Sequence, residues 1–79
     1  MSSYTYEEKT GMRQHAQTLI SDTRRSQTNG ELAEHFGYAS GFLADLPEVG
    51  VCTDEEAAEW KFQLRQAKDE ASERLVDLD

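Results

Sequence analysis

Three side chains of this 79-residue sequence are suited to nucleophilic or metal chemistry: Cys52, His15 and His35. Cys52 lies just before a predicted helix, and a helix N-terminus lowers the pKa of a thiol and favours the reactive thiolate. Four acidic residues follow within seven positions, and their negative charge acts in the opposite direction by raising that pKa. The spacing places neither histidine beside the cysteine as a general base. We therefore expect that the protein is not an enzyme.

The same three residues do not form a metal-binding motif. Two histidines and one cysteine fall short of the paired ligands that a zinc site requires. The acidic run Asp54-Glu55-Glu56 lacks the spaced ligands and the glycine of a calcium loop. Its position at a helix start instead suits the positive end of the helix dipole. We expect no metal and no other cofactor.

The distribution of charge is the strongest functional signal. Residues 26–60 contain eight acidic residues and no lysine or arginine, whereas the rest of the chain contains eight acids and all eight bases. The net charge of −8 therefore comes entirely from this segment. Such a segment repels nucleic acid and anionic lipid and attracts basic protein surfaces. Because bases cluster only at Arg24-Arg25, we expect no direct nucleic-acid binding, and no apolar run is long enough for a membrane span.

Three helices are predicted to position these residues. Thr-x-x-Glu patterns, which are typical of capping boxes, begin at Thr5, Thr28 and Thr53. The second helix should end before Pro47, because proline disfavours helix at the residue that precedes it. The predicted helices cover about residues 5–25, 29–46 and 54–77.

Each predicted helix has one apolar stripe at helical spacing, and no segment alternates with the period of a strand. The connections are short, which favours antiparallel neighbours. We therefore predict an all-α fold, a small three-helix antiparallel bundle that forms a single domain over residues 1–79. The stripes consist of Met12, Ala16, Leu19, Ile20 and Thr23; Leu32, Phe36, Ala39, Leu43 and Leu46; and Ala57, Trp60, Leu64, Ala67, Ala71, Leu75 and Leu78.

The second helix carries a further stripe of small residues, Ala33, Gly37, Gly41 and Ala44. A glycine inside a helix costs roughly 1 kcal/mol relative to alanine, so two of them require a reason. We expect another backbone to approach closely here, from the first or third helix of the same chain. The alternative is a homodimer or partner interface through Ala33, Gly37 and Gly41.

Three aromatic side chains are candidate anchors for a partner. Tyr38 and Phe42, with His35, flank the apolar stripe of the second helix, and Phe62 lies opposite Trp60 on the third. Exposed aromatic residues ringed by charge are typical of binding hot spots. The alternatives are contacts of Tyr38 and Phe42 within the bundle, and a single exposed phenylalanine of no function at Phe62. With the carboxylates, the predicted partner-binding residues are Glu31, Glu34, Tyr38, Phe42, Glu48, Asp54, Glu55, Glu59 and Phe62.

The small size and the carboxylate-rich segment 26–60 resemble those of accessory proteins from phages and plasmids, above all anti-CRISPR proteins and other anti-defence inhibitors. The resemblance implies an acidic inhibitor that occupies the basic nucleic-acid-binding surface of a host defence complex. Carboxylates on a helical scaffold would then imitate phosphates. The single cysteine and the absence of a signal-peptide pattern favour the cytoplasm. The alternative is a self-associating structural or regulatory helical protein, with the acidic surface serving solubility.

Overall fold

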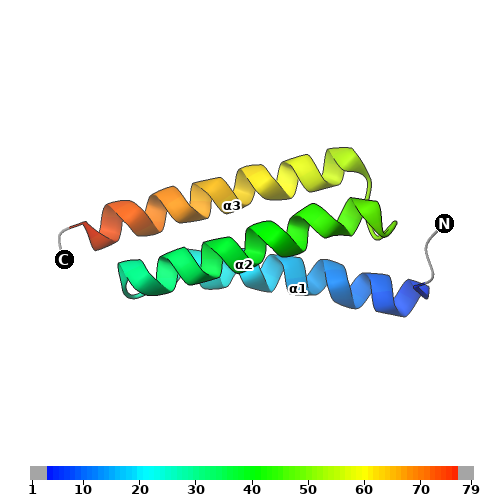
Figure 1. The fold of residues 1–79 in the computed structure, drawn as a ribbon, viewed down its shortest axis with the longest axis horizontal. Coiled ribbons are helices and arrows are strands. Elements are labelled where there is room, and N and C mark those ends of the chain that lie inside the picture. Colours follow the sequence, from blue (N-terminus) through cyan, green and yellow to red (C-terminus); the bar gives the residue numbers. More distant parts are fainter. Residues whose placement is uncertain (1–3, 77–79) are drawn as a thin grey trace.

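Three α-helices make up most of the computed structural model, which describes residues 4–76. They are α1 (Tyr6–Arg24), α2 (Asn29–Glu48) and α3 (Asp54–Leu75), labelled in Figure 1. The predicted all-α, three-helix architecture is confirmed, and so are the three helix starts. The predicted third helix ended at residue 77, which lies outside the described residues.

The helix starts follow from their threonine caps. The Thr5 and Thr53 hydroxyls each accept a hydrogen bond from the amide three residues later, and Glu8 and Glu56 accept from the threonine amides in return. The start of α2 differs from this pattern. Thr28 accepts from the Glu31 amide at 3.0 Å, but the Glu31 carboxylate accepts from the amide of Gln27 instead.

The end of α2 corrects the prediction that this helix stops at residue 46. Pro47 lies in the final turn of α2, where its missing N–H removes only one helical hydrogen bond. Gly50, at φ 79°, then reverses the chain in a conformation that suits glycine. The amide of Gly50 donates to the Pro47 carbonyl, and the amide of Val51 donates to the Leu46 carbonyl. These two bonds form a Schellman motif, which satisfies the last carbonyls of α2.

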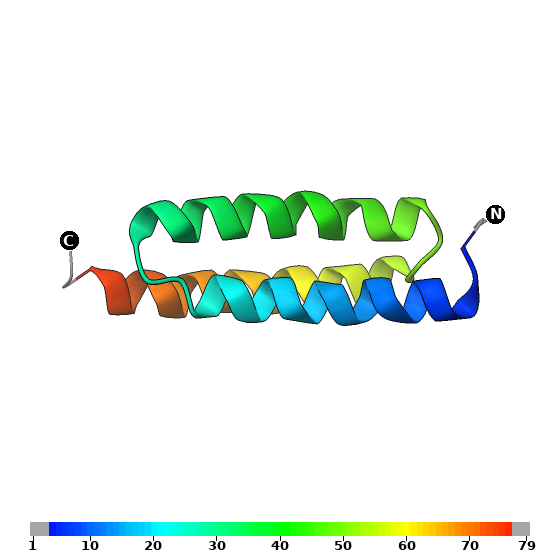
Figure 2. The same ribbon diagram turned by 90° about the horizontal axis from the view of Figure 1, so that it is seen from below.

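The three helices lie along one long axis, in a bundle of 46 × 19 × 14 Å. Figure 2 shows α1 and α3 side by side, with α2 running over both in the opposite direction. Each helix packs against the other two. The predicted antiparallel arrangement is therefore confirmed, and α2 contributes to two interhelical grooves, one beside α1 and one beside α3. None of the described helices is long and apolar enough to cross a membrane.

The apolar stripes meet in the core as the periodicity predicts. Val51, in the connection after α2, closes one end of the core, whereas neighbouring Val49 remains exposed. Met12 and Phe36 pack at the edge of the core and are only partly buried. Leu78 lies outside the described residues. The buried apolar residues are Ala16, Leu19, Ile20, Leu32, Ala39, Leu43, Leu46, Val51, Ala57, Trp60, Leu64, Ala67, Ala71 and Leu75.

Polar contacts tie the α1–α2 connection to α3 at the other end of the bundle. Arg74 donates to the backbone carbonyls of Arg24 and Ser26, and Arg24 donates to Glu70 at 2.6 Å. The buried Ser26 hydroxyl lies 2.9 Å from Nδ1 of His35. His35 of α2 therefore contacts the α1–α2 connection through Ser26.

Candidate functional site

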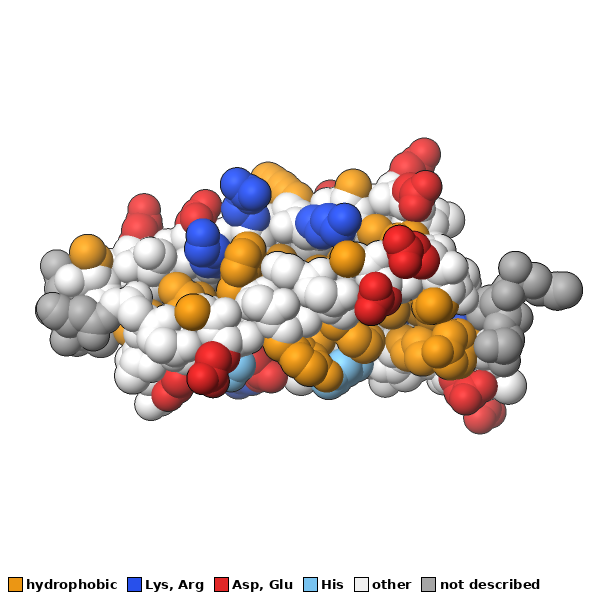
Figure 3. Space-filling model, viewed as in Figure 1, with side chains coloured by type: hydrophobic (Ala, Val, Ile, Leu, Met, Phe, Trp, Pro, Cys, Tyr) orange, Lys and Arg blue, Asp and Glu red, His pale blue; other side chains and the backbone are white. Residues whose placement is uncertain are grey.

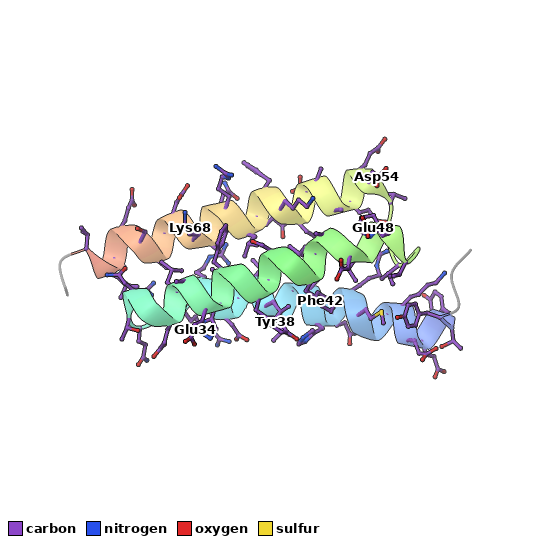
Figure 4. All side chains as sticks on the ribbon, in the orientation of Figure 1. Glu34, Tyr38, Phe42, Glu48, Asp54 and Lys68 are labelled. Carbon is purple, nitrogen blue, oxygen red and sulfur yellow. The ribbon has the colours of Figure 1, made fainter. Side chains whose placement is uncertain are left out.

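The eight acidic residues of segment 26–60 do not form one continuous surface. Residues 35–44 of α2 contain no acid, so Glu34 and Asp45 lie roughly 16 Å apart along the helix axis at 1.5 Å per residue. Figure 4 shows Glu48 and Asp54 together where α2 meets α3, and Glu34 toward the other end of the bundle. The predicted carboxylates therefore separate into Glu31 and Glu34 at one end and the remainder at the other.

The second group surrounds the connection between α2 and α3. Asp45 and Glu48 belong to the last turns of α2, and Asp54 and Glu55 to the first turn of α3. All four are exposed, and among residues 4–76 none of them forms an ion pair. We call these four residues the acidic end. The predicted Glu59 lies one turn farther along α3, where its carboxylate accepts from the Gln63 amide group at 3.3 Å.

An open apolar hollow of about 260 Å³ adjoins the acidic end between α1 and α2. Asp45 and Glu48 stand on its rim. The rim therefore offers two carboxylates beside apolar surface, at the i, i+3 spacing that places Cβ atoms about 5–6 Å apart. The apolar lining consists of Tyr4, Met12, Phe42, Leu46 and Val49.

Arg13 holds the acidic end against α1. Its guanidinium donates to both oxygens of Glu56 and, at 3.2 Å, to the backbone carbonyl of Val51, and it lies 5.5 Å from the centre of the Trp60 ring. Because Arg13 stabilises the ionised form, the pKa of Glu56 is lowered, and hydrogen bonding from Thr53 lowers it further. Glu56 is thus a structural carboxylate, used by the cap and the ion pair.

Cys52 lies half-buried in the same connection. Burial raises the pKa of its thiol, and the Glu56 carboxylate raises it further. Two of the four acids predicted to raise the pKa of Cys52, Glu56 and Asp54, do so, whereas Arg13 lowers it and burial makes the largest contribution. A raised pKa keeps the thiol protonated and weakly nucleophilic at neutral pH.

The two histidines lie apart from Cys52 in different environments. His15 contacts the rings of Tyr38 and Phe42 edge to face, with centroids 6.4 and 5.0 Å away. His35 pairs with Ser26 at the other end of the bundle. In the described residues 4–76, no three His, Cys, Asp or Glu side chains gather as metal ligands.

The predicted aromatic anchors lie on different faces. Phe42 packs against the core and lines the hollow beside the acidic end, whereas Tyr38 is 61% exposed one turn away. Phe62 is 51% exposed on α3, beside a groove between α2 and α3. The structure therefore brings Phe42 together with Glu48 and leaves Phe62 on a separate surface.

The expectation that the small-residue stripe packs inside the chain is wrong. Ala33, Gly37, Gly41 and Ala44 are all exposed on α2. A Cβ atom added to Gly37 or Gly41 would meet nothing within 4 Å. The core uses the Leu43 side of α2 instead, because α1 and α3 together cover only one face of that helix. The stripe therefore remains uncovered beside the α2–α3 groove.

The sequence analysis missed one group of functional candidates. They are the bases Lys61, Arg65 and Lys68. In the sequence, acidic residues flank them, so this part of the third helix looks like a solvated face of mixed charge. In the structure they lie along the edge of α3 that faces α2, and Lys61 and Arg65 line the groove. Figure 3 shows basic side chains over α3, with acidic side chains both toward the α2–α3 connection and farther along α3. The signal was present in their i, i+4, i+7 spacing, which places the three on one side of a helix.

Comparison with known proteins gives no relative: no family model, no curated sequence and no solved structure matches this chain. The assignment of a function therefore rests on the surfaces described above.

Proposed function

We propose that this chain is a non-enzymatic interaction protein whose acidic end binds a basic surface of a nucleic-acid-binding complex and inhibits it, as anti-CRISPR proteins inhibit host defence complexes. The observation that carries the proposal is the acidic end itself. Its four carboxylates are exposed and have no ion-pair partners among residues 4–76, and two of them, Asp45 and Glu48, line an apolar hollow.

This combination suits a lysine or arginine side chain of the partner. The aliphatic part of such a side chain is apolar and its tip is charged. The stem would occupy the hollow against Phe42 and Leu46, and the tip would lie between the carboxylates of Asp45 and Glu48. A basic side chain held in this way is no longer available to a nucleic-acid phosphate, so the protein competes with nucleic acid.

The two parts of the surface contribute differently to binding. The exposed carboxylates accelerate encounter with a basic partner, because complementary charge steers association. The apolar hollow supplies buried area, which slows dissociation. Neither Glu31 nor Glu34 lines the hollow, and Glu31 is already used by the Gln27 amide. The proposal therefore assigns contact to Glu48, Asp54, Glu55 and Phe42 of the predicted residues, and adds Asp45.

The proposed setting is the cytoplasm. Cys52 is the chain's single cysteine, and reducing compartments keep such a thiol reduced. The nucleic-acid-binding complexes of host defence act in the same compartment.

Competition for DNA tests the proposal directly. Guide-RNA-loaded CRISPR effector complexes of several types would be mixed with fluorescent target duplex, and bound duplex measured by anisotropy as the protein is added. We expect displacement for at least one type. The triple variant Asp45→Lys, Glu48→Lys and Asp54→Lys should weaken displacement by about tenfold or more, equivalent to about 1.4 kcal/mol.

A matched control separates this site from general electrostatics. Glu34→Lys, Asp69→Lys and Glu73→Lys make the same change in charge at exposed positions toward the other end of the bundle. This variant should retain most of the displacement, and both variants should keep the helical circular dichroism of the parent. Equal loss from the two variants would show that net charge alone acts, and no displacement from any complex would refute the inhibitor function.

Self-association through Ala33, Gly37 and Gly41 is the alternative function. The exposure of the stripe supports it. Charge opposes it, because Glu34 and Asp45 adjoin the stripe. In an antiparallel dimer centred between Gly37 and Gly41, Glu34 of one copy would lie level with Ala44 of the other copy, next to its Asp45. In a parallel dimer, Glu34 of one copy would face Glu34 of the other. Like charges at such spacing are destabilising.

A further inference from the structure

The groove between α2 and α3 has a charged rim of the opposite sign to the acidic end. It is open and has a volume of about 430 Å³. Phe36 and the buried Leu64 form its apolar base, and the half-exposed Phe62 borders it on α3. Ser40 and Ala58 complete the lining and are small. The groove lies between α2 and α3, two helices that pack against each other.

Lys61, Arg65 and Lys68 form the rim on α3. The first and the last lie seven positions apart, about 10 Å along the helix. The Lys68 ammonium lies 5.0 Å from the centre of the Phe36 ring, where the aromatic face attracts it. Among residues 4–76, no carboxylate lies within ion-pair distance of any of the three. The rim therefore presents a row of cations that the described part of the chain does not neutralise.

On α2 the groove is lined by Phe36 and Ser40. Two exposed glycines of the small-residue stripe, Gly37 and Gly41, directly follow these residues in the sequence, and we call them the low wall. Above Gly37 and Gly41 there is open space where side chains would otherwise stand. A wall without side chains lets another helix approach to the short end of the usual interaxial distance of about 8–10 Å. The apolar base, the cationic rim and the low wall together offer an apolar strip, a charged edge and an open approach, which are the features that an amphipathic helix needs.

The charges around the groove discriminate between occupants. Phosphate-rich ligands would meet the cations on α3 but also Glu34, Asp45 and Glu48, which adjoin the stripe on α2. A second copy of this chain would place its own Glu34 and Asp45 against the same acids. A partner helix with an acidic edge toward α3 satisfies the cationic rim and avoids both conflicts.

We propose that the α2–α3 groove binds an amphipathic α-helix of a partner protein, with the acidic edge of that helix against Lys61, Arg65 and Lys68. The apolar stripe of the bound helix covers Phe36, Leu64 and Phe62. Its backbone lies over Gly37 and Gly41. The groove shares no lining residue with the hollow beside the acidic end, so the protein can hold two partners of opposite charge at once.

Designed peptides test the groove without knowledge of the natural partner. Three helical peptides of roughly 18 residues, about 27 Å long, would share one leucine stripe and differ only in one edge, made of glutamate, glutamine or lysine. Each would be titrated into the isotope-labelled 79-residue protein, with amide chemical shifts recorded. We expect the glutamate-edged peptide to bind at least about tenfold more tightly than the glutamine-edged one, with shifts at Gly37, Gly41, Ala58 and Phe62.

Two variants provide the controls. Gly37→Leu fills the low wall, and because nothing lies within 4 Å of the added Cβ, the variant should fold like the parent while losing at least about tenfold in peptide affinity. Lys61→Glu, Arg65→Glu and Lys68→Glu should reverse the preference, so that the lysine-edged peptide moves the groove amides and the glutamate-edged one does not.

Four outcomes would overturn the proposal. They are no binding of the glutamate-edged peptide, shifts confined to residues outside the groove, equal movement of the groove amides by the glutamate- and lysine-edged peptides, and unchanged binding in Gly37→Leu. Sedimentation of the protein alone adds a fifth. If it dimerises through the groove and Gly37→Leu abolishes the dimer, the occupant is a second copy and the assignment to a partner helix is wrong.

Discussion

The acidic end and the α2–α3 groove are built alike and charged oppositely. Each has an apolar base with a leucine of the core beneath it, Leu46 in one and Leu64 in the other. Each has a row of exposed charges without ion-pair partners among the described residues. The rims differ because the last turns of α2 supply acids at the hollow, whereas Lys61, Arg65 and Lys68 of α3 supply bases at the groove. A net charge of −8 therefore does not describe a uniformly acidic surface.

The two regions also differ in how they are held. Arg13 links the acidic end to α1 through Glu56 and the Val51 carbonyl, and Gly50 fixes the turn beside it. Among residues 4–76, no hydrogen bond or ion pair joins α2 to α3 across the groove, where Lys68 contacts the Phe36 ring and the base depends on packing. The acidic end is thus fixed by specific polar contacts, whereas the groove depends on the core.

Truncating the two leucines should produce the largest effects and separate the regions. Leu46→Ala and Leu64→Ala should each lower the free energy of unfolding by roughly 2–5 kcal/mol, because both remove a nearly fully buried side chain. Chemical denaturation measures this loss. At temperatures where both variants remain folded, Leu46→Ala should weaken competition with DNA more than Leu64→Ala does. Leu64→Ala should weaken binding of the glutamate-edged peptide more than Leu46→Ala does. The reverse order would contradict the assignment of the two surfaces.

Substitutions at Gly37 and Gly41, the low wall, should increase stability. Gly37→Ala and Gly41→Ala should each raise the free energy of unfolding by up to about 1 kcal/mol, because alanine is the better helix former and its Cβ meets open space. Thermal melting should show a rise of a few degrees for a domain of this size. A loss of stability in both variants would indicate that the stripe is covered in solution, by a second copy. Competition with DNA at the acidic end should not change.

The smallest effect concerns pH. The pKa of Glu56 is lower in the folded protein than in the unfolded chain. Between these two pKa values the unfolded chain binds more protons. The free energy of unfolding therefore decreases as the pH is lowered from the ordinary glutamate pKa, about 4.3, through the folded pKa. Arg13→Met should reduce stability at pH 7 and make the decline between about pH 5 and 3 shallower, since Glu56 then titrates more nearly as in the unfolded chain. Melting temperatures across that range measure the slope.

Lys68→Met is the matched control for the pH experiment. Lys68 contacts Phe36 and has no carboxylate partner among the described residues, so its removal should leave the slope parallel to that of the parent. An unchanged slope in Arg13→Met would show that the Arg13–Glu56 pair does not contribute to acid sensitivity.

The sequence by itself determined the elements and the core. Thr5, Thr28 and Thr53 cap the helices through local hydrogen bonds that need no distant partner, and the spacing of residues such as Leu43 and Leu64 places them on one helical face. The wrong helix end at Pro47 has a related local cause. Proline disfavours the preceding helical residue, but the Schellman motif at Gly50 and the burial of Leu46 keep the last turn helical.

Only the tertiary structure decided which surfaces these elements build. Periodicity places Gly37 and Gly41 on one side of α2, but whether that side is covered depends on where α1 and α3 pack. Glu34 and Asp45 are successive acids in the sequence but separate along one helix, whereas Asp45 and Asp54 lie at the same end of the bundle because a turn reverses the chain between them. The bases from Lys61 to Lys68 form a rim only because α2 lies beside them. Local hydrogen bonds and periodicity act within one helix, whereas a surface depends on how three helices are arranged.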